Sequence, residues 1–199
     1  MINQLNKQWV WVPDWKDSSD SNTAGRIVHF TRDFELPARP TTALLQLSAD
    51  TKYKLFVNGV RAAVGPSKGG PAIWYYDSHD IAKHLHQGRN EIHFAVIRYF
   101  AQNRAAMPFE RTLYPGLTLC GRVICEEHCV DLSSTSEGWT AEVDFSREFP
   151  TGLIDDGFLY VGVLHRVQCR GRASHRMFPD QRESRSFKEP KRACNATAI

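Results

Sequence analysis

The sequence lacks a long apolar run and a charged leader. No stretch approaches the roughly 18 apolar residues that a membrane-spanning helix requires, so no membrane association is expected. The first nine residues contain no basic stretch followed by an apolar segment, which is the pattern of a secretory signal. This absence predicts a cytoplasmic protein, with an extracellular location as the alternative.

Cysteine is scarce and odd in number, with thiols at positions 120, 125, 129, 169 and 194. An odd count without a signal favours reduced thiols over a disulfide framework. Structural zinc sites usually show two short Cys or His pairs separated by a longer spacer. Cys120, Cys125, His128 and Cys129 form a single cluster with no second cluster at the usual distance. Small buried thiols are therefore expected, and no metal or other cofactor is predicted.

Net positive charge is confined to one end of the chain. The formal net charge is +3, but residues 1–164 hold 16 Lys and Arg against 19 Asp and Glu, and residues 165–199 hold 9 against 3. The last segment is rich in Arg, Ser and Glu and cannot bury enough apolar surface to offset the entropy of ordering. We expect a disordered basic tail over residues 161–199. The tail lacks interleaved aromatic residues and a known motif, so no nucleic-acid partner is predicted.

The body consists of short segments in which apolar and polar residues alternate, as in half-buried strands. Within residues 26–36, for example, Val28, Phe30, Phe34 and Leu36 share one face. Further segments of this kind cover residues 41–49, 53–57, 91–100, 117–125, 130–132 and 139–143. About eight strands with turns every 8–12 residues predict an all-β antiparallel sandwich or jelly roll. The predicted domain covers residues 9–160, after an extension of residues 1–8.

Two connections within the body carry local signals. Asn58-Gly59 lies between two strand-like runs and predicts a hairpin, since a type I′ turn needs positive φ at both central residues. The segment of residues 77–85 is compatible with one short helical turn, because Asp77 or Ser78 can cap it and Gly88 follows its end.

Several spaced motifs together resemble the N-terminal β-sandwich of fungal α-L-rhamnosidase-like proteins of glycoside hydrolase family 78. The resemblance covers roughly residues 9–158. A lone Val-Asn-Gly would be weak, because many galactose-binding-like jelly rolls share it. The motifs are Trp9–Trp15, Ser48–Gly59, Gly65-Pro66, Tyr76-Asp77, Asp80-Ile81, Leu85, Gly88–Asn90 and Phe109–Arg111.

Most of these motif residues have plain structural interpretations. Gly59 permits the turn after Asn58, and Tyr53 lies on the same strand face as Leu55 and Val57. Asp50 is placed to cap a turn through its own backbone. The set expected to be structural is Asp50, Tyr53, Asn58, Gly59, Gly65, Pro66 and Asp77.

The resemblance implies a module that precedes a large (α/α)6 barrel, where the family's catalytic acids lie. A chain of 199 residues has no room for that barrel. The family-like sequence stops within residues 153–159, as it would after a frameshift, a retained intron or an early stop, so a truncated form is expected. The resemblance therefore implies an accessory module, without catalytic residues of its own, whose partners are carbohydrate (rhamnosides among them) and a catalytic glycosidase domain.

The carboxylates of the body agree with that expectation. Glycoside hydrolysis needs two carboxyl groups that face each other across the scissile bond. The visible pairs, Glu126-Glu127 and Asp155-Asp156, are sequence neighbours, and neighbours on a strand point to opposite faces. Solvated loop charge explains both pairs better, and no catalytic residue is predicted.

Aromatic residues are the remaining indication of a binding site. Sugar rings present apolar C–H faces that stack on Trp and Tyr, while polar side chains bind the hydroxyls. Trp74, Tyr75 and Tyr76 lie beside a Gly/Pro loop, and Trp15 lies near the end of the first strand. These four residues are the candidate carbohydrate contacts, whereas Trp9 and Trp11 share one strand face and are expected in the core. The alternative is a sandwich that packs on a catalytic domain and binds no sugar itself.

Overall fold

The computed structural model describes residues 9–13, 26–67, 69, 73–99, 115–148 and 164–165. The predicted extension of residues 1–8, the candidate contact Trp15 and nearly all of the predicted tail lie outside these residues. The boundaries of the sandwich at residues 9 and 160 therefore stay a prediction. The elements are β1 (Arg26–Leu36), β2 (Thr42–Asp50), β3 (Lys52–Val57), β4 (Val60–Gly65), β5 (Asp77–Asp80), the 3₁₀ turn η1 (Ala82–His84), β6 (Gly88–Arg98), β7 (Gly116–Cys125), β8 (His128–Asp131), β9 (Trp139–Val143), β10 (Arg147–Glu148) and β11 (Leu164–His165).

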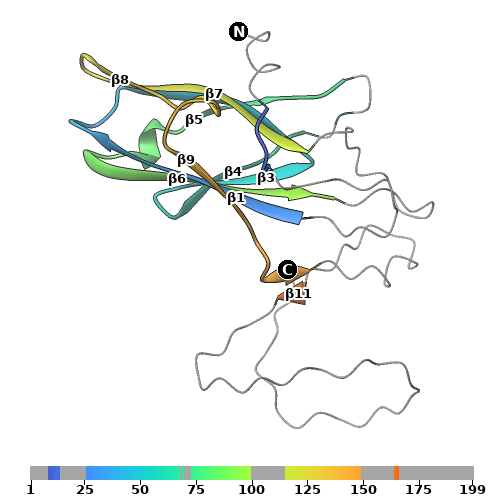
Figure 1. Cartoon of the computed structure of the whole chain (residues 1–199). Coiled ribbons are helices and arrows are strands. Elements are labelled where there is room, and N and C mark those ends of the chain that lie inside the picture. Colours follow the sequence, from blue (N-terminus) through green and yellow to red (C-terminus); the bar gives the residue numbers. More distant parts are fainter. Residues whose placement is uncertain are drawn as a thin grey trace, which may run out of the picture.

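The strands form two main antiparallel sheets that face each other (Figure 1). The five-stranded sheet has the order β4-β3-β6-β1-β9, and the four-stranded sheet has the order β5-β2-β7-β8. A two-stranded sheet joins β10 and β11. The prediction of an all-β antiparallel sandwich is confirmed. No helix among the described residues is long and apolar enough to cross a membrane.

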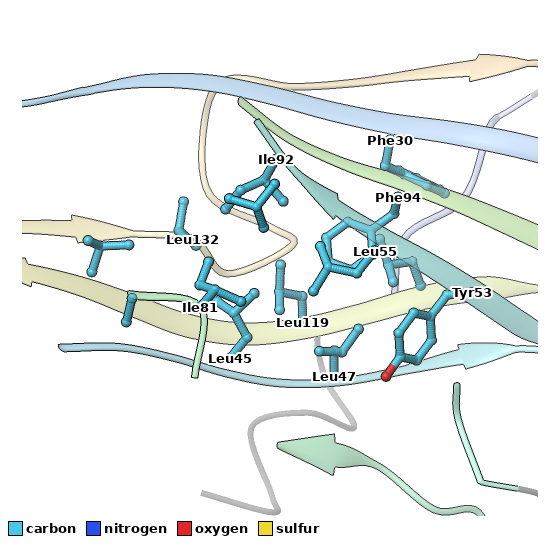
Figure 2. Packing of buried hydrophobic residues seen from close by; sticks show 14 of the residues in the cluster. Phe30, Leu45, Leu47, Tyr53, Leu55, Ile81, Ile92, Phe94, Leu119 and Leu132 are labelled. Carbon is cyan, nitrogen blue, oxygen red and sulfur yellow. The ribbon is translucent and has the colours of Figure 1, made fainter. Parts of the chain in front are cut away.

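The core fills the space between the two main sheets with one face of each central strand (Figure 2). The alternation seen in the sequence carries over directly, because side chains of successive strand residues point to opposite faces. Each fully buried Leu, Ile or Phe contributes about 1.5–3 kcal/mol relative to exposure. Fully enclosed residues from the two sheets include Leu45, Leu47, Leu55, Ile92, Phe94 and Leu119.

The predicted hairpin is present and joins β3 to β4. Asn58 and Gly59 both have positive φ, at 50° and 75°. The Asn58 side chain also ties the turn to the neighbouring strand, since its amide donates to Asn90 Oδ1 at 2.9 Å and its oxygen accepts from the Glu91 amide at 2.9 Å. The hairpin is therefore anchored by the same Asn90 that belongs to a downstream motif.

The helical turn predicted over residues 77–85 is wrong in its first half. Residues Asp77–Asp80 form the edge strand β5, paired antiparallel with β2. The backbone there satisfies its hydrogen bonds on the open edge of β2, which outweighs a weak local preference for a helix. Only Ala82–His84 are helical, and they form the 3₁₀ turn η1.

The two N-terminal tryptophans differ in burial. Trp11 packs against the core, with its ring centroid 5.9 Å from that of Phe30, as expected. Trp9 is 38% exposed and lies over Gly116, so its expected place in the core is wrong. A single bridge from Val10 to Leu117 holds this segment along β7.

Candidate functional site: an aromatic segment and two polar clusters

The candidate aromatic residues of the loop lie on a segment that leads into β5. Tyr75 and Tyr76 are 48% and 41% exposed, and Trp74 is half-buried. The Trp74 indole nitrogen is enclosed and has no hydrogen-bond partner among the described residues. Ser48 Oγ donates to the Tyr75 carbonyl at 2.7 Å, which fixes this aromatic segment (Trp74–Tyr76) to the end of β2. Two aromatic side chains are therefore held in water-accessible positions.

A cluster of hydrogen-bonded side chains follows directly after the aromatic segment. Tyr53 Oη donates to Asp77 Oδ2 at 2.6 Å and lies 2.8 Å from His79 Nε2. Because the single phenol proton goes to Asp77, His79 must donate through Nε2–H. Burial raises the pKa of Tyr53, and the bond to Asp77 raises it further, so the phenol stays protonated. We call Tyr53, Gly65, Asp77 and His79 the Tyr53 cluster.

Gly65 is the fourth member of this cluster because its neighbours leave no room for a side chain. A Cβ at this position would lie 2.0 Å from Asp77 Oδ2 and 2.7 Å from Tyr53 Oη. The next residue, Pro66, accepts a hydrogen bond from Lys52 Nζ at 2.6 Å. The structure thus brings Tyr53, Gly65, Pro66 and Asp77 together at the margin between the two sheets.

Asp50 lies elsewhere, at the buried end of β2. Its carboxylate forms an ion pair with Arg98 of β6, with 2.6 Å between Oδ1 and Nη1, and both side chains are enclosed. The sequence indicated a turn cap at Asp50 and gave no sign of this partner. Breaking such a pair by removing one member leaves a buried charge without compensation, so the pair links the two sheets where β2 and β6 end.

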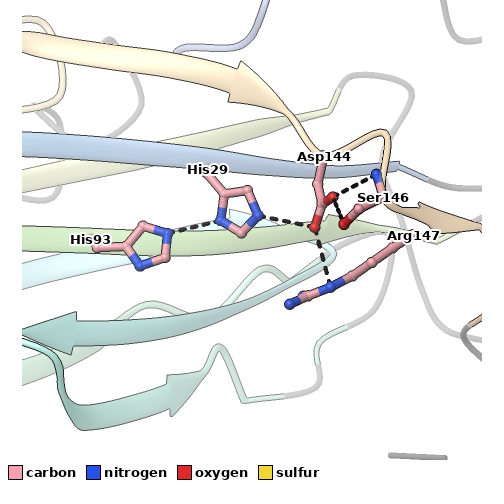
Figure 3. Close-up of polar contacts among 5 residues, drawn as sticks. All are labelled: His29, His93, Asp144, Ser146 and Arg147. Atoms are coloured by element: carbon pink, nitrogen blue, oxygen red, sulfur yellow. Dashed lines mark hydrogen bonds and ion pairs between the residues drawn. The ribbon is translucent and has the colours of Figure 1, made fainter. Parts of the chain in front are cut away.

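A second polar cluster lies on the outer face of the five-stranded sheet (Figure 3). His29 of β1 is joined through Nδ1 to His93 Nε2 of β6 at 2.8 Å, and through Nε2 to Asp144 Oδ2 at 3.1 Å. The two histidines are diagonal neighbours, because His29 pairs with Ala95 and His93 pairs with Thr31. We call His29, His93 and Asp144 the histidine relay.

Asp144 is the anchor of the relay. Its carboxylate accepts hydrogen bonds from the Ser146 amide at 2.9 Å and from Ser146 Oγ at 2.5 Å, and it lies 3.2 Å from Arg147 Nε. Burial opposes ionisation, but the hydrogen bonds from Ser146 and His29 and the charge of Arg147 lower the pKa of Asp144 overall. Asp144 is therefore a carboxylate at neutral pH.

Burial lowers the pKa of His93, and the neighbouring His29 and Arg147 lower it further. One face of its ring lies against Phe56 of β3, with centroids 5.5 Å apart and planes at 22°. His93 is therefore neutral at pH 7. No member of the relay was predicted from the sequence.

The remaining candidate groups carry little chemistry. Glu126 and Glu127 form the exposed turn between β7 and β8, and the other carboxylate pair, residues 155–156, lies outside the described residues. Cys125 is buried and donates to the Ala38 carbonyl, whereas Cys129 is exposed, against the expectation of buried thiols. Within the described part of the chain, no three His, Cys, Asp or Glu side chains are grouped to hold a metal ion.

Comparison with known proteins gives structural relatives only. No family model and no curated protein matches the sequence. A GH78 family rhamnosidase of Bacillus sp. GL1 aligns with a TM-score of 0.50 and 27% identity, over 68% of this chain and 13% of the rhamnosidase.

Two other solved structures share the fold. The α-L-rhamnosidase of Streptomyces avermitilis, complexed with L-rhamnose, aligns with a TM-score of 0.50 and 19% identity, over 68% of this chain and 12% of its own. That of Dictyoglumus thermophilum aligns with a TM-score of 0.51 and 17% identity, over 71% and 17%. The chain thus spans 12–17% of the length of these enzymes. It contains a β-sandwich similar to one domain of α-L-rhamnosidases.

Proposed function

We propose that this chain is a non-catalytic accessory module of an α-L-rhamnosidase-like glycosidase, which binds carbohydrate or positions it for a catalytic domain. The observation that carries the proposal is the likeness to the Bacillus rhamnosidase, at 27% identity over 68% of this chain. The proposal includes the N-terminal place of the module in its parent protein and the membership of that parent among the fungal proteins of the family.

The aromatic segment supports sugar binding as the role of the module. Tyr75 and Tyr76 present amphipathic rings to water at the end of a rigid sandwich. Rings of this kind stack on the C–H faces of sugars at a low cost in side-chain entropy. In this proposal Trp15, Trp74, Tyr75 and Tyr76 contribute the stacking contacts, and rhamnosides are the first ligands to test.

The test is a titration of the full chain with methyl α-L-rhamnoside, followed by tryptophan fluorescence and by calorimetry. We expect saturable binding that is lost in the double variant Tyr75→Ala/Tyr76→Ala. The matched control is Leu44→Ala, which removes an equally exposed side chain from the outer face of the four-stranded sheet. Absence of saturable binding with rhamnosides and with a panel of other glycans would contradict the proposal of sugar binding.

A second function, packing on a catalytic domain without sugar contact, is supported by a different surface. Leu44 of β2 and Ile124 of β7 are 45% and 41% exposed on the outer face of the four-stranded sheet. They are diagonal neighbours, since Leu44 pairs with Arg122 and Thr42 pairs with Ile124. Light scattering of the wild-type chain and of Leu44→Lys/Ile124→Lys tests this role. Self-association that the double variant abolishes supports it, and a wild-type monomer contradicts it.

A further inference from the structure

The histidine relay ends on an open hydrogen-bond acceptor. Asp144 can only accept, so His29 must donate through Nε2–H. We assign one proton to each ring, so His29 Nδ1 is an acceptor and His93 donates to it through Nε2–H. The lone pair of His93 consequently lies on Nδ1. That atom has no hydrogen-bond partner among the described residues.

A purely structural role explains only part of this arrangement. Asp144 and His29 tie the segment after β9 to β1, and Ser146 and Arg147 complete the carboxylate's partners. Those contacts would hold the segment without His93. The second ring, that of His93, adds one hydrogen bond on a partly exposed surface, where water satisfies histidine equally well. Its effect is to fix the ring and its tautomer, which sets the direction of one outward-facing acceptor.

The surroundings of His93 match the chemistry of a sugar. Phe56 lies flat against one face of the ring and supplies an apolar neighbour. Ala95 follows on the same strand face and has only a methyl group. Its side chain therefore leaves space on the sheet surface beside the two histidines. Lys54 and Glu142 are exposed on the strands at either side of Ala95 and His29. They supply a donor and an acceptor at the borders of this surface.

The protonation state selects the class of ligand. A neutral His93 with a free Nδ1 accepts a hydrogen bond and cannot give one at that atom. A carboxylate, like a fully ionised phosphate, has only acceptors and would meet a lone pair there. A neutral polyol presents both hydroxyl donors and apolar C–H groups, which fit Nδ1 and Phe56.

We propose that the outer face of the five-stranded sheet around His93 is a carbohydrate subsite, in which a ligand hydroxyl donates to His93 Nδ1 while the apolar side of the sugar ring lies beside Phe56. This inference rests on the proposed function and gives it a second contact region, separate from the aromatic segment. His29 and Asp144 act as positioning residues, since they orient His93 and need not touch the ligand.

The decisive variant is His93→Phe in the full chain, which keeps a flat ring against Phe56 and removes the acceptor. The control is His128→Phe, an exposed histidine of β8. The probes are methyl α-L-rhamnoside and L-rhamnose, followed by heteronuclear NMR on ¹⁵N-labelled protein. We expect the control to bind as the wild type does and His93→Phe to bind at least about tenfold more weakly.

Two results separate this inference from the proposed function. Saturable shifts confined to Tyr75 and Tyr76, with unchanged affinity in His93→Phe, would overturn the subsite and leave the carbohydrate module standing. No shifts at any residue with any sugar would remove the proposed function itself.

A readout that needs no ligand tests the positioning role directly. Long-range ¹H–¹⁵N spectra at pH 7 should show His93 protonated at Nε2 and bare at Nδ1, and His29→Gln should mix the two tautomers. A wild-type His93 protonated at Nδ1 would overturn the subsite.

Discussion

The Tyr53 cluster and the histidine relay are built from similar side chains but differ in burial. Tyr53 is 2% exposed, whereas both rings of the relay lie partly exposed on the outer face of a sheet. In the Tyr53 cluster, the phenol of Tyr53 bonds Asp77 and His79, and Gly65 packs directly against two of the bonded atoms. In the relay, the bonds run from Asp144 through His29 to His93 and leave Nδ1 of the last ring open. A network built around a buried residue contributes stability, whereas a network on an outer face offers recognition. The difference predicts which substitutions affect folding and which affect binding.

The largest effect on stability is expected from Gly65→Ala. The added Cβ would meet Asp77 Oδ2 at 2.0 Å, so the cluster must shift, and overpacking of this kind costs about 1–3 kcal/mol. Urea unfolding measures the loss. The control is Gly59→Asn, because nothing lies within 4 Å of a Cβ there and Asn tolerates its positive φ. Equal stability of Gly65→Ala and the wild type would contradict the closed packing of the cluster.

Tyr53→Phe should have the next largest effect. The substitution keeps the ring in the core but removes the hydroxyl that bonds Asp77 and His79, and leaving such groups unpaired costs about 1–3 kcal/mol. Thermal unfolding of the variant should show a clearly lower Tm. An unchanged Tm would mean that water replaces the hydroxyl group and that the hydrogen bonds of the Tyr53 cluster contribute no net stability.

A smaller loss of about 0.5–1 kcal/mol is expected for His29→Gln, because the His29 side chain is 27% exposed and Asp144 keeps its bonds to Ser146. Chemical denaturation measures this difference against Tyr53→Phe. The pKa of His93 should rise in His29→Gln, since His29 opposes the protonation of His93, and NMR titration reports it. A loss as large as that of Tyr53→Phe would remove the distinction between the two clusters.

The smallest expected effect is on the pH dependence of the free energy of unfolding, to which the histidine relay contributes through His93. The pKa of His93 is lowered from 6.5 in the folded chain, so below pH 6.5 the unfolded chain binds more protons. The contribution of His93 to the free energy of unfolding is complete above pH 6.5. It is lost as the pH falls through the pKa of His93 in the folded chain. Asp144, whose pKa is lowered from 3.8, acts in the same direction at more acidic pH.

Unfolding free energies at pH 7.5 and 5.5 test this expectation. The wild type should lose more stability between these values than His93→Phe does. Equal losses in the two proteins would show that His93 titrates as a solvated histidine. The other titratable or charged groups near the relay are His29, Arg147, Lys54 and Glu142, and all are unchanged in that comparison.

The fold was largely predictable because one buried face per strand leaves a period-two pattern. Phe30, Leu45 and Phe94 all lie where that alternation placed them. The strand Asp77–Asp80 was missed because its sequence is polar at every position, and its pairing with β2 is a tertiary effect.

The relay was beyond the reach of sequence reasoning for a similar cause. His29 lies 64 residues from His93 and 115 from Asp144, and only the register of β1 with β6 brings them together. The alternation did place His29 on the polar face of its strand. A predicted pairing of β1 with β6 would then have been the signal needed to find the pair.

The most direct test of the carbohydrate proposal is a titration of the full chain with methyl α-L-rhamnoside, followed residue by residue by NMR. Saturable shifts at Tyr75 and Tyr76, and at the His93 side chain, are the predicted result. Spectra that stay unchanged at every described residue, with rhamnosides and with the wider glycan panel, would contradict the claim that this sandwich is a carbohydrate module.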